Sequence, residues 1–301
     1  MTQLQWWFRA MRPATLVLSI APTAVGFAWA WRHAQQLDWF SAVLTLMCAV
    51  SLQIIANGVN ELGDYRRGAD TPERFGPVRA IAVGAIAPRA MQRAVVVLSA
   101  MVLTLGLVLV ARVGWWLLVV GVSALVLAWL YTSGSRPLAY IGLGEVVALV
   151  FFGPVPALGA YAIAHSTVAI EPLLSGIAFG ALAAAVLGIN NLRDINVDRA
   201  AGKYTLAVQF GRHRATRLVQ LLLLLPLAIV AVMSIQYVTV SVAIVVMPIL
   251  WSIARQLQHA HGRQYNGLLV RTALATGMFA VLLIAGIIAS KTWSDTVVEI
   301  P

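Results

Sequence analysis

Residues 173–198 read LLSGIAFGALAAAVLGINNLRDINVD, and this stretch decides what kind of fold the chain can form. It contains no charged residue before Arg193 and then places three charges within six residues. A run of about 20 apolar residues is the length that an α-helix needs to cross a lipid bilayer. The stretch therefore predicts a membrane-spanning helix whose end carries polar residues.

The rest of the chain repeats this pattern. Of its 301 residues, 60% are hydrophobic and 11% are charged, against roughly 25% charged in a typical soluble domain. The apolar runs are continuous and do not alternate with period two, which favours helices over barrel strands. We predict an all-α, polytopic membrane protein with one transmembrane domain, residues 1–301. Its nine expected spans are residues 14–31, 41–60, 94–111, 115–131, 143–164, 173–191, 218–236, 238–254 and 272–290.

The basic residues predict how the protein is oriented. With nine spans, 18 of the 21 Lys and Arg residues fall on one side, and only Arg32, Arg112 and Lys291 fall on the other. Basic loops stay in the cytoplasm. We therefore expect a multi-pass protein of the cytoplasmic (inner) membrane, with the N-terminus and both long loops, 61–93 and 192–217, inside and the C-terminus outside. The net charge of +10 then reflects topology and does not indicate a nucleic-acid partner.

Each long loop follows a span that ends in asparagines and acids. The residues concerned are Asn57, Asn60, Glu61, Asp64 and Asp70 in the first cluster, and Asn190, Asp194 and Asp198 in the second. Their spacing of three or four residues puts most of each cluster on one helix face, where like charges repel unless a cation neutralises them. Carboxylate and amide oxygens suit Mg²⁺, which usually also binds substrate phosphates.

Basic residues flank both clusters and suit a bound anion. They are Arg66, Arg67, Arg193, Arg199 and Lys203. Polar helix ends that simply face the cytoplasm are the alternative interpretation. The recurrence of one composition at two helix ends favours a magnesium–diphosphate site, with Glu61, Asp64, Asp70, Asp194 and Asp198 as candidate metal ligands.

Three further residues are candidates for the same site. Tyr131 and Arg136 belong to a Gly- and Pro-containing turn after the fourth span, where Arg136 either reaches the diphosphate or only completes a turn. Glu145 lies near the start of the next apolar span. Acids inside spans are functional candidates, although at a helix N-terminus Glu145 could simply favour the helix dipole.

These motifs resemble the UbiA superfamily of intramembrane aromatic prenyltransferases, and within it the naphthoate branch. The resemblance rests on residues 12–16, 60–70, 75–79, 131–137, 142–153 and 190–205. It covers the chain to about residue 211, while the last third is apolar and adds little. The family has Asp where this chain has Glu61, which keeps the charge but is one methylene longer.

The resemblance implies a helical bundle around a central cavity that opens laterally to lipid. It implies Mg²⁺ as cofactor, with polyprenyl diphosphate and an aromatic acceptor, 1,4-dihydroxy-2-naphthoate, as partners. The diphosphate leaves, the ring attacks the allylic cation at the carbon that bears the carboxylate, and CO₂ is lost. Asp64, Asp194, Asp198 and Lys203 would be catalytic. The candidate substrate-binding residues are Asn57, Asn60, Arg67, Tyr131, Arg136, Glu145, Asn190 and Arg193.

Two other functions remain open at this point. The same chemistry could use another acceptor, such as 4-hydroxybenzoate or homogentisate. A transporter is more distant, because ion pathways place acids near the middle of the bilayer and every predicted span centre lacks an acid.

Overall fold

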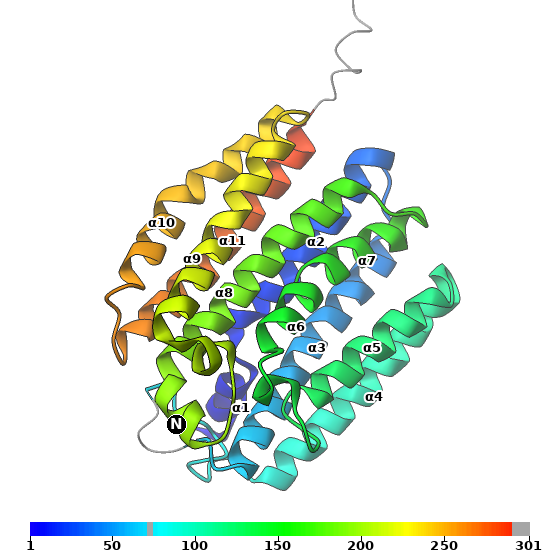
Figure 1. The fold of residues 1–301 in the computed structure, drawn as a ribbon. Coiled ribbons are helices and arrows are strands. Elements are labelled where there is room, and N and C mark those ends of the chain that lie inside the picture. The colour runs from blue at the N-terminus through cyan, green and yellow to red at the C-terminus, as the bar shows by residue number, and fades with distance from the viewer. Residues whose placement is uncertain (71–74, 291–301) are drawn as a thin grey trace, which may run out of the picture.

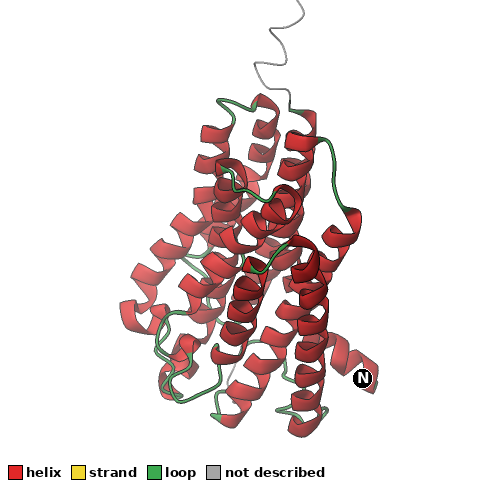
Figure 2. Cartoon of the chain, turned by 90° about the vertical axis from the view of Figure 1, so that its right-hand side faces the viewer, coloured by secondary structure: helices red, strands yellow, loops and turns green. Residues whose placement is uncertain are grey.

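The computed structural model describes residues 1–70 and 75–290, and across these residues it contains helices and no strand (Figure 2). This confirms the predicted all-α class. The elements are α1 (Gln3–Met11), α2 (Pro13–Ala34), α3 (Trp39–Arg66), α4 (Pro88–Val113), α5 (Trp116–Leu130), η1 (Leu138–Tyr140), α6 (Gly144–Phe151), α7 (Pro154–His165), α8 (Ile170–Ala200), α9 (Leu206–Met233), η2 (Val238–Val246), α10 (Met247–Gln256) and α11 (Gln264–Ala289).

Within the described residues, eight helical segments are long and apolar enough to cross a membrane, so the chain is an integral membrane protein. Two of them are composite, because α6 continues into α7 and η2 continues into α10. The remaining predicted span corresponds to α5, which is apolar but has only 15 residues. At 1.5 Å per residue α5 extends about 22 Å, less than the ~30 Å hydrocarbon core, so the count of nine is approximate.

The break between α6 and α7 follows from the local sequence. Pro154 starts α7, where its missing N–H costs nothing. Just before it, the backbone at Gly153 packs directly against Gly176 and Gly180 of α8. Small residues at such positions let helix backbones approach closely in a membrane. The break therefore fixes α6 and α7 against the centre of the bundle.

Helix α8 is the central element of the fold. It contacts α9, α6, α7, α2 and α11, and it is the most buried of the membrane-spanning helices. Figure 1 shows α4 and α5 at one edge of the bundle and α10 at the opposite edge. The buried side chains form two large clusters, one around α8, α9 and α11 and the other around α3 and α4.

Three segments that are distant from one another in the chain lie at the same end of the bundle. The N-terminus, the segment after α3 and the segment after α8 all lie at the lower end in Figure 1. Figure 2 shows the short N-terminal helix α1 extending sideways at that same end. The predicted location of the C-terminus concerns residues 291–301, which lie outside the described part of the chain.

Candidate active site

The first acidic cluster occupies the last turns of α3. Glu61 and Asp64 are buried there, with 2% and 3% of their surface exposed. After α3 ends, Gly68 adopts a positive φ of 67°, and the Ala69 amide donates back to the Asp64 carbonyl. Glu61 accepts a hydrogen bond of 3.0 Å from the Ile81 amide. One Glu61 oxygen therefore anchors the segment between α3 and α4.

The second cluster ends α8 in the same way. Gly202 has a φ of 68°, and the Lys203 amide donates to the Asp198 carbonyl at 2.8 Å. A glycine at this position lets the chain leave the helix in a left-handed turn without strain. The turn folds Lys203 back toward the end of its own helix.

The tertiary structure brings the two clusters together. Lys203 Nζ lies 3.5 Å from an Asp64 oxygen and 3.8 Å from an Asp198 oxygen. Arg79 approaches Asp64 at 3.6 Å and Asp70 at 3.5 Å. The Tyr140 hydroxyl donates to Asp64 at 3.1 Å. Burial and the adjacent Asp64 carboxylate raise the pKa of Tyr140, so its hydroxyl keeps the proton that it donates.

Asp194 is held differently from Asp64. Arg193 binds both Asp194 oxygens, at 2.8 and 2.7 Å, in a fork-like contact. The same guanidinium donates to the side-chain oxygens of Asn190 and Asn266, at 2.6 and 2.8 Å. Asn266 on α11 in turn donates to the Phe75 carbonyl at 2.9 Å. Arg193 thus connects the second cluster to α11 and, through Asn266, to the segment after α3.

A small polar pocket of about 20 Å³ lies where the clusters meet. Its lining includes Asn60, Asp64, Arg79, Tyr131, Asn190, Asn191, Asp194, Asp198 and Lys203. It adjoins a chamber of about 1260 Å³, and Asn60, Arg79, Tyr131 and Asn190 line both spaces. The chamber wall is otherwise mainly apolar and comes from helices α1 to α8 and α11. It exceeds the usual 300–1,000 Å³ range of small-ligand pockets.

The donor set fits a magnesium ion. Among the described residues, no three acidic, His or Cys side chains are grouped closely enough to hold a metal by themselves. Mg²⁺ does not need such a group, since it is usually bound by one or two carboxylates, waters and substrate phosphates. Asp64 and Asp198 face the same pocket, and the buried Asn60 side-chain oxygen there has no hydrogen-bond partner in the described structure. These hard oxygens would hold the ion together with a diphosphate.

Three other predicted residues, Asn57, Glu145 and Tyr131, make different contacts. Asn57 donates to the Met11 carbonyl at 3.0 Å, so it joins α3 to the end of α1. Glu145 accepts from Asn191 at 2.8 Å, and its second oxygen is buried without a hydrogen-bond partner among the described residues. Tyr131 lines both the pocket and the chamber.

Two of the predicted arginines, Arg67 and Arg136, differ in their contacts. Arg67 donates to the carbonyls of Thr132 and Gly134, at 3.0 and 2.6 Å, and stacks over the Tyr140 ring. It therefore ties the end of α3 to the turn after α5. Arg136 is exposed on that turn and lines neither the pocket nor the chamber, so its contact with a diphosphate stays a prediction.

Three residues of the site were not assigned a role from the sequence. Arg79 lies in residues 75–79, one of the segments that carry the family resemblance, and its positive charge was the available signal. Tyr140 lies between residues 131–137 and 142–153, two other such segments, and no neighbouring residue marked it as part of the site. Asn266 lies in the last third of the chain, where the only signal is an amide near the start of an apolar span. Tertiary contacts, which the sequence does not display, bring Arg79 and Tyr140 to Asp64 and bring Asn266 to Arg193.

Comparison with known proteins agrees with this geometry. Residues 19–283 match the model of the UbiA prenyltransferase family. A 1,4-dihydroxy-2-naphthoate octaprenyltransferase from Mycobacterium tuberculosis is 38% identical over 291 residues, covering 96% of this chain and 98% of that protein. An Escherichia coli protein of the same name is 40% identical over 224 residues, covering 72% of each chain.

A solved structure shares the fold. The UbiA homolog from Archaeoglobus fulgidus bound to GPP and Mg²⁺ superposes with a TM-score of 0.59 at 18% identity, covering 94% of this chain and 99% of that one. The family match spans most of the chain, and the Mycobacterium tuberculosis relative extends along nearly all of it. This chain belongs to the UbiA prenyltransferase family.

Proposed function

We propose that this protein transfers a polyprenyl group from polyprenyl diphosphate to 1,4-dihydroxy-2-naphthoate, releasing diphosphate and CO₂ and giving demethylmenaquinol. The observation that carries the proposal is the polar pocket between two acidic helix ends, at the head of a large apolar chamber. Such a space suits a substrate with a charged head and a long hydrocarbon tail. The names of the bacterial relatives at 38% and 40% identity support the choice of acceptor.

The diphosphate would bind in the polar pocket. Asp64 and Asp198 would hold Mg²⁺, which supplies charge stabilisation for the departing diphosphate oxygen. The Archaeoglobus fulgidus homolog, whose structure holds GPP and Mg²⁺, supports this cofactor. Lys203 and Arg79 already lie beside Asp64 and would contact diphosphate oxygens. Their interaction strengthens as the carbon–oxygen bond breaks, because negative charge then grows on the leaving group.

The remaining steps need positioning more than acid–base chemistry. When the carbon–oxygen bond breaks, the bonding pair leaves with diphosphate and an allylic cation remains. The ring carbon that bears the carboxylate attacks this cation, and the electrons of the carboxylate bond restore the aromatic ring as CO₂ leaves. The mainly apolar chamber wall would exclude water, which would otherwise quench the cation to a polyprenol.

We place the site at the cytoplasmic face of the inner membrane. The split of basic residues, 18 against three, supports this orientation through the positive-inside rule. Cytoplasmic access suits both ionic groups, the diphosphate and the carboxylate of the acceptor. The tail would enter from the bilayer, where a polyprenyl chain is soluble.

Mass spectrometry of products tests the proposal. We expect purified protein with Mg²⁺, a polyprenyl diphosphate and 1,4-dihydroxy-2-naphthoate to give the decarboxylated prenyl naphthoquinol, and chelation of the metal with EDTA to abolish the product. Readdition of Mg²⁺ should restore it. Parallel reactions with 4-hydroxybenzoate and homogentisate test the acceptor. Prenylation of either one in preference to the naphthoate would overturn the assignment.

A further inference from the structure

The chamber wall contains polar side chains well below the acidic pocket. Thr15 and Ser19 on α2 and Gln53 on α3 all line the chamber. Ser19 and Gln53 are buried, with 4% and 7% of their surface exposed. A buried polar atom without a hydrogen-bond partner destabilises the folded protein. Any polar atom on this wall that lacks an internal partner is therefore a candidate to bond a ligand in the chamber.

Most hydroxyl groups along this wall are already satisfied within their own helices. Thr15, Thr23 and Thr45 each donate to a backbone carbonyl three or four residues earlier, at 2.7–2.9 Å. Ser19 Oγ and Gln53 Oε1 are different, because both are buried and have no hydrogen-bond partner among the described residues. Two residues that line the chamber thus each hold a polar atom with no internal partner among the described residues.

The orientation of the Gln53 amide follows from its neighbour. Thr15 Oγ1 gives its proton to the Arg12 carbonyl at 2.9 Å, so it can only accept a further hydrogen bond. Gln53 Nε2 donates to that oxygen at 3.4 Å. The amide nitrogen is thus turned toward α2, and Oε1 is left as an acceptor. A ligand at this position must offer a donor, such as a hydroxyl group.

Helix geometry relates Gln53 to the reaction centre. Asp64 follows Gln53 by eleven residues, which is about three turns, so both side chains leave α3 on the same face. The rise per residue puts Gln53 about 16 Å below Asp64 along the helix axis. An acceptor ring beneath the diphosphate would present its reacting carbon toward Asp64 and the hydroxyl on the carbon two ring positions away toward Gln53.

We propose that Gln53 and Ser19 form a binding site for the hydroxyl group of the aromatic acceptor that lies farthest from the reacting carbon. In 1,4-dihydroxy-2-naphthoate this is the 4-hydroxyl, which donates to Gln53 Oε1. The inference rests on the proposed function and adds a determinant of acceptor specificity to it. A site built to bond a hydroxyl rejects the analogue that lacks it, because the polar group of the protein is then left unpaired.

The test compares two acceptors that differ only in this hydroxyl. Dissociation constants of 1,4-dihydroxy-2-naphthoate and 1-hydroxy-2-naphthoate are measured on the purified full chain and on Gln53→Met, which keeps the length of the side chain. We expect the parent protein to prefer the diol by about tenfold, the value of one hydrogen bond. Gln53→Met should weaken diol binding by about tenfold and leave the mono-ol unchanged, and the KM for polyprenyl diphosphate should not move.

Thr45→Val is the matched control. Thr45 lines the same chamber on the same helix, but its hydroxyl bonds the Ser41 carbonyl at 2.7 Å. We expect this variant to keep the parent's preference for the diol. If Gln53→Met loses both acceptors through misfolding, Ser19→Ala decides, with an expected loss of about threefold for the diol alone.

An unchanged preference in Gln53→Met and Ser19→Ala would overturn the inference and assign these polar atoms to internal water. The proposed function would survive that result as long as the parent protein still prenylates the diol. Failure of the parent to turn over the diol would instead refute the proposed function.

Discussion

Lys203 lies between Asp64 of α3 and Asp198 of α8, within 4 Å of both carboxylates. All three side chains are 10% exposed or less, so their charges are only weakly screened by water. In the proposed complex, two carboxylates balance one magnesium ion, and the charge of the diphosphate is left for cationic side chains to offset. Among the described residues, Lys203 and Arg79 are cations that lie within 4 Å of Asp64.

The two bridged carboxylates should be essential for the reaction. We expect Asp64→Asn and Asp198→Asn each to lower kcat by at least about 100-fold, roughly 2.7 kcal/mol in the barrier, because each removes a charged ligand. Steady-state product formation in detergent measures this. Asp38→Asn is the control, since Asp38 is a partly exposed acid paired with Arg112 at the start of α3. Asp64→Asn activity within about threefold of the parent would contradict a metal-ligand role.

At the scale of elements, the position of the site depends on how α6 and α7 meet α8. Glu145 is in the first turn of α6 and bonds Asn191 of α8 at 2.8 Å. The break after α6 brings the Leu149 carbonyl and Gly153 onto Gly180. A shift of α6 away from α8 would therefore separate Glu145 from the second cluster.

Adding one methyl group at Gly180 tests this contact. A Cβ there would overlap the Leu149 carbonyl oxygen, so we expect Gly180→Ala to lower the free energy of unfolding by about 1–3 kcal/mol. Thermal unfolding in detergent, followed by circular dichroism, gives the comparison. Gly267→Ala on α11 is the matched control, because a Cβ there meets nothing within 4 Å, and its stability should be equal or slightly higher. Equal stability of both variants would mean that the close approach is not needed.

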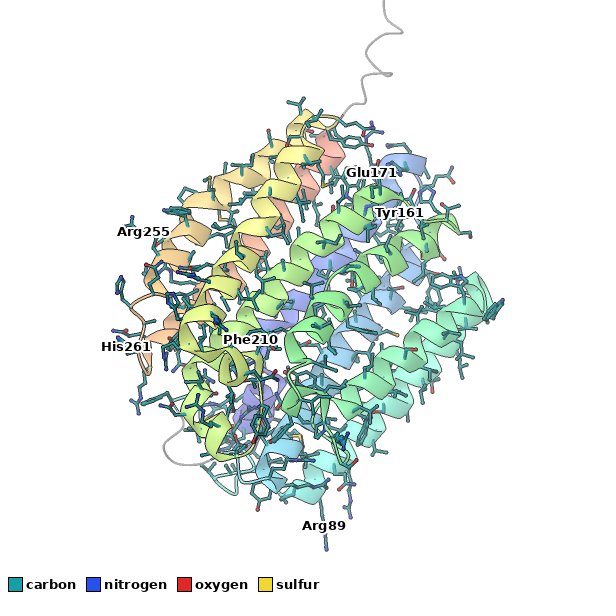
Figure 3. All side chains as sticks on the ribbon, viewed as in Figure 1. Arg89, Tyr161, Glu171, Phe210, Arg255 and His261 are labelled. Atoms are coloured by element: carbon teal, nitrogen blue, oxygen red, sulfur yellow. The ribbon has the colours of Figure 1, made fainter. Side chains whose placement is uncertain are left out.

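On the scale of the whole molecule, the two ends of the bundle carry different residues. Figure 3 labels Tyr161 and Glu171 at the upper end and Arg89 at the lower end. The acidic clusters lie at the lower end, together with most of the basic segments. This arrangement agrees with a site at the face that the positive-inside rule assigns to the cytoplasm.

Labelling of introduced cysteines tests the orientation. Tyr204, in the segment after α8, is 59% exposed, and Val168, between α7 and α8, is 74% exposed. In a Cys48→Ala background, we expect a membrane-impermeant maleimide to label Tyr204→Cys only from the cytoplasmic side and Val168→Cys only from the outside. Disruption of the membrane should expose both positions and serves as the control. The reverse pattern would invert the proposed topology.

The class of the protein and the polar composition of one end of the bundle follow from the sequence alone. Apolar runs of span length require helices in a bilayer, because backbone polar groups must be bonded within the segment. The spacing from Asn57 to Asp64 and from Asn190 to Asp198 is a local property of a helix, so the shared face of each cluster could be read directly. Gly68 and Gly202 each follow one of the clusters in the sequence. In the structure both adopt a positive φ just after the helix ends.

Which side chains face one another across helices depends instead on how the helices pack. The tertiary structure pairs one Glu61 oxygen with the Ile81 amide and turns Arg67 to carbonyls of another segment. It also brings Tyr140 to Asp64 and Asn266 to Arg193. These pairings depend on the rotation and approach of neighbouring helices, which close contacts between small residues set. The spacing of residues along the chain does not reveal how neighbouring helices are rotated. The partners of each acid therefore cannot be inferred from that spacing.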